Sequence, residues 1–280
     1  MNNKSVFRSE SGKKNIQDRY SALLEAWPVP CVRRMVDTSL GSTHIIISGE
    51  EDAPPLLLLH GASSNSAGWM GDAGTWSKDF RLIAADMPGE PGMSCDRRLD
   101  VAGDDYIFWL ESLLDSVGYG SVSIIGMSLG SFAALKFATV RPERVKKLSM
   151  LTTSGFVPAR LSFMFKALPL MFLGDWGSDR VNKIVAHKTP MPIEAIEFGR
   201  LVSKHYKPMM TPIPLFTDDE LKRLTMPVQY FGGNKDALID SEATALRLRA
   251  QVPHAEVNLL PDTGHLVLGQ TEKILGFMKG

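Results

Sequence analysis

The sequence lacks several features that define whole classes of proteins. It has two cysteines, Cys31 and Cys95, which are too few for a disulfide framework and do not form a CxxC pair. Its 31 Lys and Arg residues balance 31 Asp and Glu residues, so no net charge attracts nucleic acid or an anionic membrane. There is no HExxH motif, no Walker loop and no GxGxxG that opens a helix. We therefore expect no metal, no cofactor and no nucleic-acid partner.

Long apolar runs are also missing. The most apolar stretch, 161–173, is interrupted by Ser162, Lys166 and Pro169 and is shorter than the roughly 20 residues of a membrane-spanning helix. Residues 1–14 are polar and contain no apolar core of a secretory signal. Because 44% of the 280 residues are hydrophobic, the chain can bury a large core. We expect a soluble, cytoplasmic protein without a membrane span that acts on a small molecule.

What the sequence does contain is a long alternation of strand-like and helix-like segments. Short apolar runs end at glycines or polar loops, and amphipathic segments of helical period follow several of them. The expected strands are 32–37, 44–48, 55–59, 81–85, 122–125, 145–151, 228–231 and 256–260, and the expected helices are 16–27, 104–117, 131–140, 241–250 and 270–278. This order predicts an α/β fold with a mostly parallel sheet flanked by helices.

Residues 156–225 interrupt this alternation. The segment contains no convincing strand, seven prolines, and methionines interspersed with phenylalanines. These methionines are Met164, Met171, Met191, Met209 and Met210. We interpret the segment as a helical cap inserted over the carboxyl edge of the sheet, so that 1–280 forms a single domain. Most of its Met and Phe side chains would pack within the cap, and a minority would line a pocket.

A candidate nucleophile lies in the segment Gly126-Met127-Ser128-Leu129-Gly130. A G-x-S-x-G pattern arises in a random chain of this length with a probability on the order of one in ten, so the pattern alone is weak. Here it follows an expected strand and precedes a helix rich in small residues. A sharp strand-to-helix turn would expose the Ser128 hydroxyl, and the two glycines would leave room for that turn.

A second loop, His60-Gly61-Ala62-Ser63, follows the leucine-rich strand 55–59. Acyl transfer needs amide donors aimed at the oxygen that becomes negative in the tetrahedral intermediate. The amide of Leu129, directly after the nucleophile, would supply one donor of this oxyanion hole. The other would come from Ala62, with Ser63 as the alternative. We interpret His60 as a brace for the loop without a catalytic role.

A serine nucleophile on such a turn needs a carboxylate and then a histidine further along the chain. His265 follows the last expected strand and is the candidate base among six histidines. Asp236 follows the preceding strand through a Gly-Gly turn and is the candidate acid. Asp240 is its main rival, although it is also well placed to cap the helix that begins near 241. Asp262 lies on the same loop as His265.

Taken together, these segments resemble the α/β-hydrolase superfamily, and within it the capped carboxylesterase and lipolytic branch. The matching segments are His60-Gly61, Asp86–Ser94, Gly126–Gly130, Arg141–Val145, Gly233–Asp236 and Gly264-His265. The segment 86–94 has one residue more between its glycines than the family's D-x-P-G-x-G-x-S loop. The resemblance implies an eight-stranded sheet and a serine esterase that cleaves carboxylic esters through an acyl-enzyme. The Met- and Phe-rich segment 156–225 favours small to medium, apolar acyl groups.

Other functions are compatible with the same residues. Lactonases, thioesterases, C–C bond hydrolases and acyltransferases use a similar triad on this fold, which therefore cannot separate them. A protein of a different class, a ligand sensor or partner-binding protein, could also keep the fold. The presence of Ser128, Asp236 and His265 together weighs against this second class. The sequence determines neither the physiological substrate nor the oligomeric state.

Overall fold

The computed structural model describes residues 5–170 and 173–280, and in this part of the chain eight strands form one sheet. They are β1 (Cys31–Thr38), β2 (Gly41–Ser48), β3 (Pro55–Leu59), β4 (Arg81–Ala85), β5 (Val122–Met127), β6 (Val145–Leu151), β7 (Val228–Gly233) and β8 (Glu256–Leu260). Their order is β1-β2-β4-β3-β5-β6-β7-β8, antiparallel at β1–β2 and β2–β4 and parallel elsewhere. The expected eight-stranded, mostly parallel sheet is confirmed.

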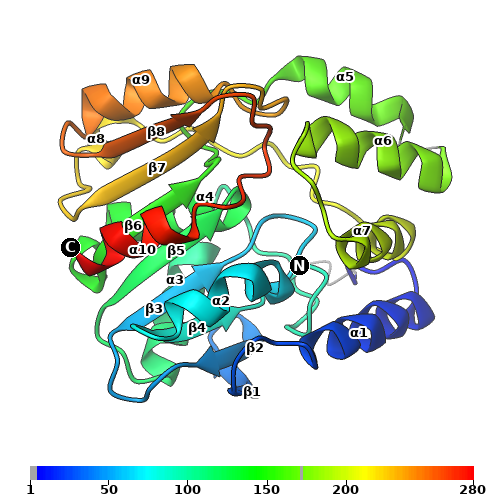
Figure 1. Ribbon diagram of the computed structural model, residues 1–280, viewed down its shortest axis with the longest axis horizontal. Helices are drawn as coiled ribbons and strands as arrows, with labels where there is room; N and C mark the ends of the chain where they lie inside the picture. Colours follow the sequence, from blue (N-terminus) through cyan, green and yellow to red (C-terminus); the bar gives the residue numbers. More distant parts are fainter. Residues whose placement is uncertain (1–4, 171–172) are drawn as a thin grey trace.

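Helices cover both faces of this sheet (Figure 1). They are α1 (Glu10–Leu24), α2 (Met70–Trp76), α3 (Asp105–Ser116), α4 (Leu129–Val140), α5 (Leu161–Leu170), α6 (Gly174–Ala186), α7 (Ile193–His205), α8 (Asp218–Leu221), α9 (Ser241–Gln251) and α10 (Thr271–Lys279). Two short 3-10 helices lie at Ser66–Trp69 and Pro142–Arg144. None of the helices in the described ranges is long and apolar enough to cross a membrane.

The leucines of β3 show how the sheet is buried. Leu56 and Leu58 belong to the apolar core under α1, α2 and α10, whereas Leu57 and Leu59 belong to the core under α3, α4 and α9. Successive side chains of a strand point to opposite faces, so a strand covered on both sides needs an unbroken apolar run. The run of leucines therefore places β3 in the interior of the sheet, next to β5.

The helices α5, α6 and α7 lie between β6 and β7 in the chain and gather at one side of the sheet (Figure 1). The N-terminal segment joins the end of α7: Phe7 forms an antiparallel bridge with Tyr206, and the amide of Arg8 donates to the carbonyl of His205 at 2.8 Å. The expected polar leader and cap also include residues 1–4 and Met171, which lie outside the described residues. The inserted helices are thus tied to the start of the chain.

Some boundaries differ from the sequence-based expectation. The first helix begins at Glu10 rather than at Ile16, because the Ser9 side chain caps it by accepting from the amide of Gly12 at 3.0 Å. Its early turns are polar and exposed, so no apolar stripe marks them. The α4 helix begins at Leu129, two residues before the expected start, and this places Ser128 at its N-cap.

Candidate active site

Ser128 occupies a tight turn between β5 and α4. Its φ of 50° is in the left-handed region, which is costly for a residue with a side chain. The glycines at 126 and 130 make the turn possible. A Cβ atom at Gly126 would lie 2.6 Å from the Cα of Ser131, and one at Gly130 would overlap the carbonyl oxygen of Leu59. The backbone therefore holds the Ser128 side chain at the carboxyl edge of the sheet.

Of the three residues expected to form a triad, His265 lies within hydrogen-bond distance of the other two, Ser128 and Asp236. His265 Nε2 is 2.9 Å from Ser128 Oγ, and His265 Nδ1 is 2.7 Å from Asp236 Oδ2. The other oxygen of Asp236 accepts from the amides of Leu238 at 2.7 Å and Ile239 at 3.1 Å. With its proton on Nδ1, the imidazole donates to the carboxylate and leaves Nε2 free to accept the serine proton.

Sheet topology explains why residues so far apart in the sequence meet here. Because β5, β7 and β8 run parallel, the loops that follow them emerge at the same edge of the sheet. The acid and histidine loops are also joined directly. The amide of Asn234 donates to the carbonyl of Leu260 at 3.0 Å, and that of Lys235 donates to the carbonyl of Thr263 at 2.9 Å. These bonds fix the position of the loop of Asp236 relative to the loop of His265.

The histidine loop also contacts α6. The amide of His265 donates to the carbonyl of Val185 at 2.9 Å. A Cβ atom at Gly264 would lie 2.8 Å from the Cβ of His187, so this glycine permits the close approach. Asp262, on the same loop, pairs with His187 at 3.0 Å and Lys188 at 2.6 Å. Its carboxylate thus binds the inserted helix region and is not the partner of His265.

The two amides expected to form the oxyanion hole belong to Leu129, directly after the expected nucleophile, and to Ala62, in the loop that follows β3. A Cβ atom at Gly61, next to Ala62, would lie 3.6 Å from the Cβ of Ser128. Among the residues that the structure describes, no protein acceptor takes a hydrogen bond from the amide of Ala62 or Leu129. The amide of Ser63, the alternative donor, is already bound to the carboxylate of Glu90 at 2.6 Å. Ala62 and Leu129 therefore have amides available for a substrate oxygen.

His60 braces the loop 60–63, the expected oxyanion loop. Its Nε2 accepts from the amide of Met87 at 2.9 Å, and its Nδ1 lies 2.8 Å from the carbonyl oxygen of Gly61, to which it donates. Complete burial lowers the pKa of His60 below its usual value, which favours the neutral ring that this arrangement requires. The ring is thus occupied by structural contacts, in agreement with the sequence-based interpretation.

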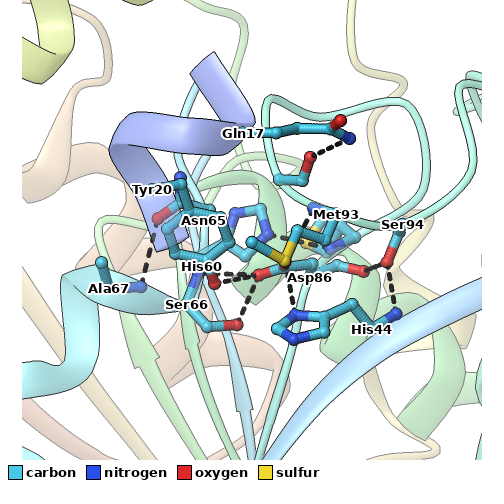
Figure 2. Close-up of polar contacts among 12 residues, drawn as sticks. Gln17, Tyr20, His44, His60, Asn65, Ser66, Ala67, Asp86, Met93 and Ser94 are labelled. Atoms are coloured by element: carbon cyan, nitrogen blue, oxygen red, sulfur yellow. Dashed lines mark hydrogen bonds and ion pairs between the residues drawn. The ribbon is translucent and has the colours of Figure 1, made fainter. Parts of the chain in front are cut away.

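Behind the oxyanion loop lies a fully buried carboxylate, Asp86, shown in Figure 2. One oxygen accepts from the hydroxyl of Tyr20 at 2.8 Å and from the hydroxyl and amide of Ser66 at 2.7 and 3.0 Å. The other accepts from His44 Nδ1 at 2.9 Å and the amide of Met93 at 3.0 Å. Burial alone would raise the pKa of Asp86, but His44, His60 and the amide of Met93 lower it to about 2.

Asp240, the rival acid, caps α9: its side chain accepts from the amide of Ala243 at 3.0 Å. We expect Asp240→Ala to lower the free energy of unfolding by about 1 kcal/mol, the typical value of such a cap, and to leave kcat for an ester unchanged. Urea denaturation and steady-state kinetics on the purified variant measure the two effects. A loss of kcat like that of Asp236→Asn, measured in parallel, would transfer the role of the acid to Asp240.

Comparisons with known proteins agree with this geometry. The model of the alpha/beta hydrolase family matches residues 56–275. The uncharacterized carboxylesterase nap of Bacillus subtilis is 31% identical over 92% of this chain and 88% of its own length. Carboxylesterase YbfK of the same organism is 30% identical over 97% of this chain and 95% of its own. The crystal structure of naproxen esterase from Bacillus subtilis has a TM-score of 0.86 at 27% identity and covers 97% of this chain and 99% of that one.

The chain therefore belongs to the alpha/beta hydrolase family. Within that family it is similar along nearly its whole length to carboxylesterases, which confirms the expected branch.

Proposed function

We propose that this protein hydrolyses carboxylic esters of small to medium apolar acyl groups, with Ser128 as nucleophile, His265 as base and Asp236 as orienting acid. The observation that carries the proposal is the pair of contacts on one imidazole, 2.9 Å to Ser128 Oγ and 2.7 Å to Asp236 Oδ2. Similarity to carboxylesterases over nearly the whole chain supports an ester as the substrate.

The mechanism follows from this arrangement. His265 Nε2 accepts the Ser128 proton while Oγ attacks the ester carbonyl, and Asp236 stabilises the imidazolium that forms. The amides of Ala62 and Leu129 bind the oxyanion of the tetrahedral intermediate. The imidazolium then protonates the departing alcohol, which leaves an acyl-enzyme. Water attacks this ester with the same base, and the carboxylic acid is released.

The inserted segment 156–225 acts in this proposal as a cap of a single domain, 1–280. Its α6 helix ends beside the histidine loop with Ile184, Val185 and Ala186, and the carbonyl of Val185 accepts from the amide of His265. The apolar residues of the cap support an acyl chain over a charged group as the substrate, because burying a charge without a partner is costly.

A panel of p-nitrophenyl esters with acyl chains of increasing length, a lactone and a thioester tests the proposal. We expect ester hydrolysis with a kcat/KM that rises by about four-fold for each methylene that becomes buried, the equivalent of ~0.8 kcal/mol. Ser128→Ala provides the background rate for every compound. Equal rates for wild type and this variant on all esters, without labelling of either by a fluorophosphonate, would favour a ligand sensor instead.

A further inference from the structure

Glu90 is a buried carboxyl that the proposed reaction does not use. It is 4% exposed and lies in the loop after β4, where the sequence has one residue more than the family pattern. Its Oε2 accepts a hydrogen bond from the amide of Ser63 at 2.6 Å. Ser63 directly follows Ala62, the expected oxyanion donor, so this carboxylate is attached to the oxyanion loop one residue from the donor itself.

The burial of Glu90 has an energetic cost. Burial raises the pKa of its carboxyl to about 7, against the opposing effects of the Ser63 amide, Arg98 and the hydroxyl of Tyr206. A carboxylate at this position lowers the stability of the folded protein, because a neutral or apolar side chain would fill the space with a smaller desolvation penalty. What Glu90 makes and an apolar side chain of similar size could not make is the hydrogen bond with the amide of Ser63.

The peptide plane that carries the Ala62 amide is held on its carbonyl side by His60, whose Nδ1 donates to the carbonyl of Gly61 at 2.8 Å. The next plane, between Ala62 and Ser63, is the one that Glu90 holds. Ala62 and Ser63 are both exposed, so side-chain packing does not hold them. Ser63 also has a φ of 56°, a left-handed conformation that a serine does not favour. The hydrogen bond to Glu90 fixes the peptide plane between Ala62 and Ser63. That plane adjoins the one that carries the Ala62 amide, so holding it restrains the backbone torsions of Ala62 and, together with His60, the direction of the Ala62 amide.

The loop that carries Glu90 is itself held firmly. The amide of Glu90 donates to the carbonyl of Met87 at 3.1 Å, and the Tyr206 hydroxyl donates to the carbonyl of Gly89 at 2.9 Å. Arg98 Nη2 in turn donates to the Tyr206 hydroxyl at 3.0 Å. Since Tyr206 follows α7, this support connects the end of the inserted helices with the oxyanion loop.

We infer that Glu90 is a positioning residue for the proposed esterase reaction: through the amide of Ser63 it orients the Ala62 amide towards the oxyanion. The inference rests on the proposed function. An oxyanion donor acts mainly on the transition state, so a disoriented Ala62 amide lowers kcat and leaves KM nearly unchanged.

Two conservative variants separate the position of the acceptor from its charge. Glu90→Gln keeps a carbonyl oxygen at the same reach and removes the charge, whereas Glu90→Asp keeps the charge and withdraws the acceptor by one methylene. On a p-nitrophenyl ester we expect Glu90→Asp to lose about ten-fold or more in kcat, because ångström-scale misplacement at a reacting centre is costly. We expect Glu90→Gln to retain most of the wild-type kcat and both variants to retain its KM.

Gln17→Leu is a matched control, because Gln17 Nε2 donates at 3.4 Å to the carbonyl of Gly92, on the same loop but away from Ser63. Its kcat should equal that of wild type. Thermal melts, monitored by circular dichroism, identify a temperature at which every variant is folded. The values of kcat and KM are compared at that temperature. A kcat for Glu90→Asp equal to wild type, an equal or larger loss in Glu90→Gln, or a change in KM instead of kcat would overturn the inference.

The two proposals fail in different ways. If wild type hydrolyses the ester, Ser128→Ala does not, and both Glu90 variants match wild type, the positioning role alone is wrong. If wild type and Ser128→Ala are equally inactive on all esters and no fluorophosphonate label is incorporated, the proposed function is wrong and the role of Glu90 in it is wrong too.

Discussion

Ser128→Ala is expected to lower kcat for a good ester substrate by about 10⁴-fold or more, since in the proposed mechanism it removes the atom that attacks the carbonyl and abolishes the acyl-enzyme. The protein should remain folded. Alanine meets the same backbone demand at φ 50° as serine, and the hydroxyl has no hydrogen-bond partner in the described chain other than His265. Steady-state kinetics together with circular dichroism separates lost chemistry from lost structure.

The cooperation of the triad provides a sharper test. His265→Ala should lose about as much kcat as Ser128→Ala, and the double variant should lose no more than either alone, because the two side chains act as one unit. His254→Ala is the matched control: its imidazole lies 2.9 Å from the carbonyl oxygen of Met226, on a loop outside the site, and kcat should not change. Losses that add in the double variant would contradict a shared proton transfer.

Asp86→Asn is expected to lower the free energy of unfolding by about 3–5 kcal/mol, a large part of the stability of a typical domain. The carboxylate accepts from Tyr20, Ser66, His44 and Met93, whereas an amide brings donors of its own to a place that already contains donors (Figure 2). Buried donors that lose their acceptor carry the full cost of desolvation. Urea denaturation at neutral pH measures the difference.

The contribution of Asp86 to stability should depend on pH. The pKa of its carboxyl is about 2 in the folded protein and 3.8 ordinarily, so ionisation favours the folded state above pH 3.8. This contribution, about 2 kcal/mol, is lost as the pH falls from about 4 to about 2, and Asp86→Asn should not show that loss.

Asp262→Asn is the control for this measurement, because Asp262 also pairs with a histidine and a lysine but is exposed. It should change the free energy of unfolding far less than Asp86→Asn does, because exposed ion pairs are screened by solvent. If Asp86→Asn lowered the free energy of unfolding no more than Asp262→Asn does, the hydrogen bonds of the Asp86 carboxylate would not stabilise the protein as expected.

Local signals predicted most of the sheet and the meeting of the triad. Three kinds of segment each predict a local structure that the fold contains. They are the leucine run at 55–59, the glycines around Ser128, and the loops that carry Asp236 and His265. The end of each strand could therefore be deduced, and parallel strands bring those ends to one edge. The first helix was less predictable, because its opening turns are polar and only the Ser9 cap marks the start.

The partners of Asp86 and Glu90 could not be deduced in the same way. Tyr20 and His44 reach Asp86 from α1 and β2, and nothing in their local sequence indicates a shared carboxylate. The extra residue around Glu90 is a visible departure from the family pattern, but its contact with Ser63 depends on how two loops pack. Contacts between distant loops follow from tertiary packing, which residue periodicity does not describe.

The backbone bond from His265 to Val185 joins the base of the proposed reaction to α6, a helix of the proposed cap. Selectivity and turnover are consequently not independent properties of this enzyme. If α6 borders the acyl group as proposed, a substitution in this helix that moves the carbonyl of residue 185 also moves the imidazole, so variants with altered selectivity and full turnover are expected among those that leave this carbonyl in place.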